Sequence, residues 1–219
     1  MQNLDQLFIL LFNRSGGVYI PDIKECRFFS QMPTNMLGDD FQNKGISCSN
    51  AYKKLFGHVD KETLCGNISN DYIFYYKKSI KNILREYKNN KQKLLKILII
   101  IRNPYKRVFS IYHHWYKEHY LNDDFCCFFG KSDHYKKKRY AWTYQLQELG
   151  MTFNAVKAYI ENFPRVKILL FDNINDKFFY DEIKNFLNID NNIYAKKENI
   201  NFYFKQGSLL KKNIYIFKN

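Results

Sequence analysis

Apolar residues recur along the chain with two different periods, which predict alternating strands and helices. The uninterrupted run from Ile97 to Ile101 is mostly β-branched, as in a strand that other elements cover on both faces. Residues 166–171 predict a second buried strand, and residues 18–20 a short extended segment. Strands alternating with helices in this order predict a three-layer α/β fold around a parallel sheet.

Apolar stripes with helical spacing predict the helices between these strands. They lie at residues 4–11, 51–56, 80–87, 153–163 and 179–187, of which 51–56 is expected to form only a helical turn. The Ser15-Gly16-Gly17 breaker ends the first of them, and Pro164 ends the fourth. Residues 31–49 have little periodicity, and we expect them to cover the functional site.

The densest group of candidate chemistry follows the run that ends at Ile101. Arg102 stands at the carboxyl end of that strand, Asn103 at a helix N-cap position and Pro104 at the first helical position. The buried stripe of the helix is expected at positions 108, 111, 112 and 115. Arg107, Ser110 and His114 share another face, so we expect polar groups to converge near Arg102. A guanidinium there can grip a phosphate, although an arginine after a strand is also a common surface ion-pair residue.

Three segments in the right order resemble sulfotransferases that use 3′-phosphoadenosine 5′-phosphosulfate (PAPS). Arg102-Asn103-Pro104, Arg107 and Ser110 resemble the 3′-phosphate-binding motif of that family. Residues 19–30 are similar to its P-x-x-K-E-x-x-F-F segment, and residues 163–189 resemble its late strand, acidic turn and FLGI helix. The resemblance implies one P-loop-type α/β domain over residues 1–219, closest to the carbohydrate-directed, heparan sulfate N-sulfotransferase-like branch.

The resemblance also implies roles for single residues. Arg102 and Ser110 would bind the 3′-phosphate of the donor, and Lys205, in a weaker match, its adenosine phosphate. Glu25 would be the catalytic base, and Lys24 would contact the substrate and favour the ionised carboxylate.

His114 matches a family histidine that faces the acceptor. Without the resemblance, Lys24 and Glu25 would be an exposed turn pair and His114 a structural or solvated side chain. No metal is implied.

The chain also departs from the family pattern. Family members begin with a strand and a phosphate-binding loop that contains Lys and a Gly-Thr-Thr-like sequence, and no such loop precedes Leu4 here. The segment Gly66 to Tyr72 lacks two charged positions of the family's acceptor segment. We therefore expect an N-terminally incomplete domain without its first strand, with the flanks of the 97–101 strand exposed and little or no activity.

Composition favours anionic partners. The formal net charge is +14, and a 46% hydrophobic, 18% aromatic chain of 219 residues can bury one ordinary core. A PAPS donor with a carbohydrate acceptor fits this charge. Single-stranded nucleic acid would fit it too, because residues 136–139 form a basic run beside Tyr135 and Tyr140.

The cysteines and the hydropathy indicate neither a disulfide framework nor a membrane anchor. Five cysteines, at positions 26, 48, 65, 126 and 127, are odd in number and lack paired C-x-x-C spacing, which favours reduced thiols and no zinc site. No apolar run reaches the roughly 18 residues of a membrane helix, so a cytoplasmic protein is the simplest expectation.

The sequence is thus interpreted as a carbohydrate-directed sulfotransferase. One alternative is a non-catalytic remnant that binds anionic nucleotides or glycans. A third and more distant alternative is a basic nucleic-acid-binding protein.

Overall fold

The structure is a computed structural model of the 219-residue chain. It describes residues 6–11, 18–21, 23, 26–31, 45–60, 63–88, 91–117, 122–189, 204–205 and 208–209, with backbone alone at 6–11, 91–92, 204–205 and 208–209.

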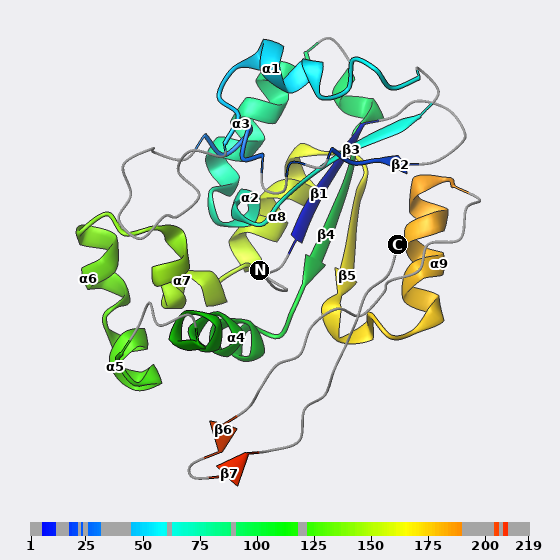
Figure 1. Ribbon diagram of the computed structural model, residues 1–219. Coiled ribbons are helices and arrows are strands. Elements are labelled where there is room, and N and C mark those ends of the chain that lie inside the picture. The colour runs from blue at the N-terminus through cyan, green and yellow to red at the C-terminus, as the bar shows by residue number, and fades with distance from the viewer. Residues whose placement is uncertain are drawn as a thin grey trace.

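The centre of the molecule is a five-stranded sheet in the order β2-β3-β1-β4-β5 (Figure 1). Its strands are β1 (Gln6–Leu11), β2 (Val18–Tyr19), β3 (Leu64–Ser69), β4 (Lys96–Ile101) and β5 (Val166–Leu170). The pairs β2–β3 and β4–β5 are parallel, whereas β1 is antiparallel to both of its neighbours. Four strands therefore run in one direction around a reversed central strand, and the carboxyl ends of β3, β4 and β5 share one edge.

Strand β4 separates two hydrophobic layers because successive side chains point to opposite faces of a sheet. Ile97 and Ile99 face a core built with α2 (Asp71–Phe74), α3 (Tyr76–Glu86) and α8 (Phe153–Asn162). Leu98 and Ile100 face a second core, whose helix is α9 (Lys177–Leu187). Figure 1 shows α8 and α9 on opposite sides of the sheet. These layers confirm the expected three-layer α/β architecture.

A helical lobe lies beside the carboxyl edge of the sheet. Helix α4 (Pro104–Lys117) packs there on α7 (Leu146–Gly150), and α5 (Phe125–Gly130), α6 (Ser132–Lys137) and the 3-10 turn η2 (Trp142–Tyr144) complete the lobe (Figure 1). Its aromatic-rich core contains the buried stripe expected for α4, at Val108, Ile111, Tyr112 and Trp115.

The remaining elements are short. They are α1 (Ser49–Lys54), the 3-10 turns η1 (Lys91–Leu94) and η3 (Phe171–Asn173), and a separate hairpin of β6 (Phe204–Lys205) and β7 (Ser208–Leu209). Helix α9 begins at an N-cap where Asp176 accepts a hydrogen bond from the backbone N–H of Phe178, at 3.0 Å. It ends at Asn188, whose φ of 58° is the left-handed conformation common after helices.

Two sequence-based expectations about the sheet are wrong. Residues 6–11 form the strand β1 and not part of a helix, because both β3 and β4 pair with this segment. The apolar flanks of β4 are also not exposed, since β1 and β5 lie on either side and Ile97 to Ile100 are buried.

The second predicted buried strand needs a smaller correction. Strand β5 forms where expected, but it lies at the edge of the described sheet and is only partly buried. Its last residue, Leu170, is 53% exposed.

Candidate functional site

The carboxyl edge of the sheet brings Arg102 and Phe171 together. Ile101 and Leu170 are register partners at the ends of the parallel strands β4 and β5, so the next residues of the two strands emerge side by side. The Arg102 guanidinium carbon lies 5.2 Å from the centroid of the Phe171 ring, a cation–π arrangement. The aromatic face orients the guanidinium and leaves its N–H groups for other partners.

Arg102 retains hydrogen-bonding capacity at this position. Among the described residues, its Nε is buried without a hydrogen-bond partner. A buried donor without a partner costs stability, and an anionic ligand that accepted from it would remove that cost. Nearby, Lys106 pairs with Asp172 at 3.0 Å, but both side chains are largely exposed, and such pairs contribute little to stability.

Helix α4 starts directly after Arg102 and carries two further candidates. Its first turn is capped as expected, because Asn103 Oδ1 accepts hydrogen bonds from the backbone N–H groups of Tyr105 and Lys106, at 3.0 and 3.2 Å. Ser110 and His114 follow one turn apart on one flank, both half-buried. The His114 ring lies 5.5 Å from that of Trp115, so it borders the core of the helical lobe.

Arg107 differs from its neighbours on the expected polar face. Its side chain is buried, with 1% of the residue exposed. Its Nη1 donates a 2.6 Å hydrogen bond to the backbone carbonyl of Leu149, in the last turn of α7. A cation at the carboxyl end of a helix is favourable, so this arginine ties α4 to α7.

The segment Cys26–Ser30 is attached to the carboxyl end of β3, which belongs to the same edge of the sheet. The backbone N–H of Arg27 donates to Ser69 Oγ at 3.1 Å, and Ser30 Oγ donates to the buried Asp71 carboxylate at 2.6 Å. Phe28 and Phe29, the two aromatic residues of the family-like motif, are buried in the core.

The other candidates have little structural description. Lys24 and Glu25 lie outside the described residues, although Glu25 directly precedes the anchored Cys26 in sequence. Lys205 lies in β6, where only the backbone is described. Their predicted roles stay predictions.

Two features of this edge escaped sequence reasoning. Phe171 could have been found from the sequence, because it directly follows one parallel strand in the same way that Arg102 follows the other. Asn67 and Tyr72, which bond the Cys26 segment, gave no signal, because their contacts span 41 and 46 residues of sequence.

Comparison with solved structures identifies the architecture. The chain superimposes on the crystal structure of a sulfotransferase from Alicyclobacillus acidocaldarius with a TM-score of 0.71 and 28% identity. The match covers 81% of this chain and 73% of the other. The chain has a sulfotransferase fold. This likeness supports a sulfotransferase-like function and, with it, a nucleotide donor and an acceptor substrate. Neither protein-family models nor curated protein sequences give a match.

The described residues offer neither a metal-binding cluster nor a membrane-spanning helix. In the described part of the chain, no three side chains of His, Cys, Asp or Glu are grouped so that they could hold a metal ion. Within the same residues, no helix combines the length and apolar character needed to cross a bilayer.

Proposed function

We propose that this protein transfers the sulfuryl group of PAPS to a hydroxyl or amine of a carbohydrate. The observation that carries the proposal is Arg102, which stands at the carboxyl end of β4 in a sulfotransferase fold with a buried, unpartnered Nε. Parallel α/β sheets bind ligands at this edge. The net charge of +14 favours the polyanionic donor.

Each candidate residue has a role in this reaction. Arg102 and Ser110 bind the 3′-phosphate of PAPS, and Lys205 contributes to the adenosine phosphate site. The acceptor oxygen or nitrogen attacks sulfur in line as the bond from sulfur to the bridging phosphate oxygen breaks. Glu25 takes the acceptor proton, with Lys24 favouring its ionised form and His114 orienting the acceptor. The leaving group is 3′-phosphoadenosine 5′-phosphate (PAP).

The direction of β1 favours a second candidate, a non-catalytic protein that binds anionic nucleotides or glycans. Leu11, the last residue of β1, pairs with Cys65 near the start of β3, so β1 ends at the edge opposite Arg102. A phosphate loop placed directly after β1 would therefore not reach the Arg102 edge. Each preorganised donor removed from around a transferring group costs about 10²- to 10³-fold in rate, so a donor without such a loop would react slowly.

Binding of PAP tests the donor site. Arg102→Ala should weaken PAP binding by about 10- to 150-fold in calorimetry, the loss expected for hydrogen bonds to a charged group. Adenosine 5′-phosphate, which lacks the 3′-phosphate, should be affected much less. Arg165→Ala is the matched control, because Arg165 precedes β5 at the opposite edge and is exposed. Equal losses for both nucleotides would contradict the assignment of Arg102.

Transfer from radiolabelled PAPS to a panel of glycans separates the two candidate functions. An enzyme should label at least one acceptor, and Glu25→Gln should cut its turnover by about 10²-fold or more with PAP affinity nearly unchanged. PAP binding without any transfer would favour the non-catalytic alternative. The nucleic-acid alternative instead predicts binding of single strands that weakens steeply with salt through the exposed run at 136–139.

A further inference from the structure

The segment Cys26–Gln31 is held in a conformation that its own sequence disfavours. Arg27 and Gln31 have φ angles of 53° and 41°, in the left-handed region that side chains with a Cβ rarely adopt. Such residues persist where the surrounding structure determines them, and they occur often at functional sites. The hydrogen bonds that hold this segment therefore bear on its functional role.

A closed ring of three hydrogen bonds holds the start of the segment. Cys26 Sγ donates to Asn67 Oδ1 at 3.1 Å, and Asn67 Nδ2 donates to the Tyr72 hydroxyl at 3.0 Å. The thiol has only one proton, so the 3.6 Å contact between the Tyr72 hydroxyl and Cys26 Sγ is a bond that Tyr72 donates. Each side chain thus both donates and accepts within the ring, an arrangement in which the bonds strengthen one another.

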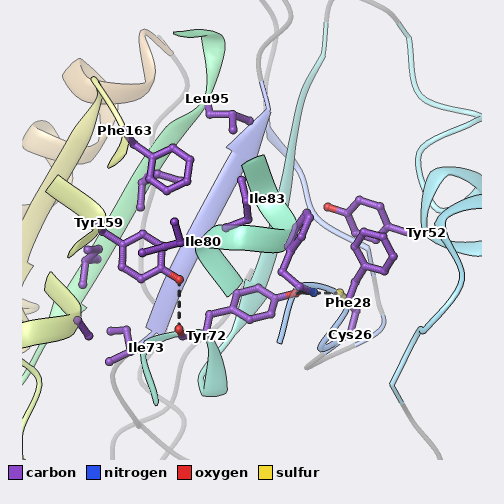
Figure 2. Close-up of a cluster of buried hydrophobic side chains, with 14 residues drawn as sticks. Cys26, Phe28, Tyr52, Tyr72, Ile73, Ile80, Ile83, Leu95, Tyr159 and Phe163 are labelled. Atoms are coloured by element: carbon purple, nitrogen blue, oxygen red, sulfur yellow. Dashed lines mark hydrogen bonds between the residues drawn. The ribbon is translucent and has the colours of Figure 1, made fainter. Parts of the chain in front are cut away.

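The same two residues reach beyond the ring. The Tyr72 hydroxyl also accepts from the backbone N–H of Phe29 at 3.4 Å, and Asn67 Nδ2 lies 3.3 Å from the Tyr52 hydroxyl. Figure 2 shows Tyr72 and Tyr52 around Cys26 and Phe28 in the core. Burial raises the pKa of the Cys26 thiol and that of the Tyr72 hydroxyl, so both stay protonated and the ring persists at neutral pH.

Backbone contacts fix the rest of the segment. Asn82 Nδ2, from α3, donates to the Phe29 carbonyl at 2.7 Å, and the backbone N–H of Ile46 donates to the Cys26 carbonyl at 2.8 Å. Together with the bonds from Arg27 to Ser69 and from Ser30 to Asp71, they join the segment to three other parts of the chain. Cys26 and Phe29 are the two ends of this turn. Among the described residues, Tyr72 alone bonds both of them through one side-chain atom, its hydroxyl oxygen.

We propose that Tyr72, oriented by Asn67, is the positioning residue that fixes the segment after Glu25 against the carboxyl end of β3. This inference rests on the proposed function, because the role of the anchored segment is to position Glu25, the proposed base, next to the acceptor. Glu25 is joined by one peptide bond to Cys26, which the ring holds. Loss of the Tyr72 hydroxyl would leave the core packed but free the backbone on which the base is carried.

Hydrogen exchange of the full chain tests the anchoring directly. Tyr72→Phe should speed exchange in peptides covering residues 26–31 by about tenfold, because the Phe29 N–H loses its acceptor and the ring is broken. Tyr159→Phe is the matched control. Tyr159 is fully buried in the same core, and its hydroxyl donates to the Tyr72 carbonyl and not to the segment (Figure 2). Both variants should lose similar thermal stability, but only Tyr72→Phe should loosen residues 26–31.

Kinetics supplies the readout that a purely structural role would not change. Tyr72→Phe should lower kcat about tenfold or more while KM for PAPS stays within about twofold, and Tyr159→Phe should change neither. Unchanged exchange at 26–31 in Tyr72→Phe, or equal acceleration in both variants, would overturn the inference. Exchange needs no turnover, so it decides whether Tyr72 anchors residues 26–31 even if the wild type transfers no sulfuryl group, a result that would count against the proposed function alone.

Discussion

Lys96 should make the stability of this protein depend on pH in an unusual direction. It is the first residue of β4 and only 4% exposed, with its Nζ 5.7 Å from the centroid of the Phe186 ring. Burial, and secondarily the positive charge of Arg165, lowers the pKa of Lys96 from 10.5 to about 8. The folded protein therefore releases this proton more easily than the unfolded chain does.

The sign of the effect follows from proton linkage. Between pH 8 and 10.5 the unfolded state binds more protons at Lys96 than the folded state, so the free energy of unfolding rises with pH across this window. A lowering by this amount corresponds to about 3 kcal/mol in total, of which about 2 kcal/mol falls between pH 7 and 9.5. At pH 7 the buried charge lowers stability.

Lys96→Met replaces the charge with an apolar chain of similar length. The variant should be more stable at pH 7 by about 1–3 kcal/mol, since the lost cation–π contact with Phe186 offsets part of the gain. The stability difference between the wild type and the variant should narrow steadily as the pH rises from 8, and it should vanish only above about pH 10.5. The difference between their two pH curves isolates Lys96, because the buried cysteine and tyrosines titrate alike in both proteins.

Urea unfolding at pH 7, 8, 9 and 9.5 measures this difference. Lys157→Met is the matched control, because Lys157 is 61% exposed on α8 and pairs with Glu161 across one helical turn. Its stability curve should stay parallel to that of the wild type at every pH. If the Lys96→Met curve is parallel as well, the ammonium of Lys96 is solvated in the folded protein and the reasoning from burial fails.

Two further predictions concern a thiol and a helix cap. Backbone N–H groups of Ala51 and Asn50 lower the pKa of the exposed Cys48. Mass-spectrometric mapping of alkylation near pH 8 should therefore find Cys48 modified before the exposed cysteines of α5. The buried Cys26 should react only in denaturant. A Cys26 that reacts under native conditions would contradict its place in the core. Asn103→Ala removes the cap of α4 and should cost about 1 kcal/mol of stability in urea unfolding, and an unchanged midpoint would show that the cap contributes nothing.

Local signals determined much of the fold near the candidate site. The β-branched run before Arg102 predicted β4, and Asn103 with Pro104 predicted the start of α4, because strand burial and helix capping depend on adjacent residues. The helical stripe at 153–163 and the stop at Pro164 likewise predicted α8. Arg102 directly follows β4, and α4 carries Ser110 and His114, so the sequence alone located three candidate residues relative to these two elements.

The tertiary structure decided what depends on distant partners. Residues 6–11 can satisfy either a helical or a strand pattern, and they become a reversed strand because β3 and β4 pair with them from 53 or more residues away. The contact of Arg102 with Phe171 depends on the register of β4 against β5. The hydrogen-bonded ring of Cys26, Asn67 and Tyr72 depends on a turn that packs against the end of β3. Periodicity records which face of an element is buried, but not which element covers it, and only the folded chain brings these side chains together.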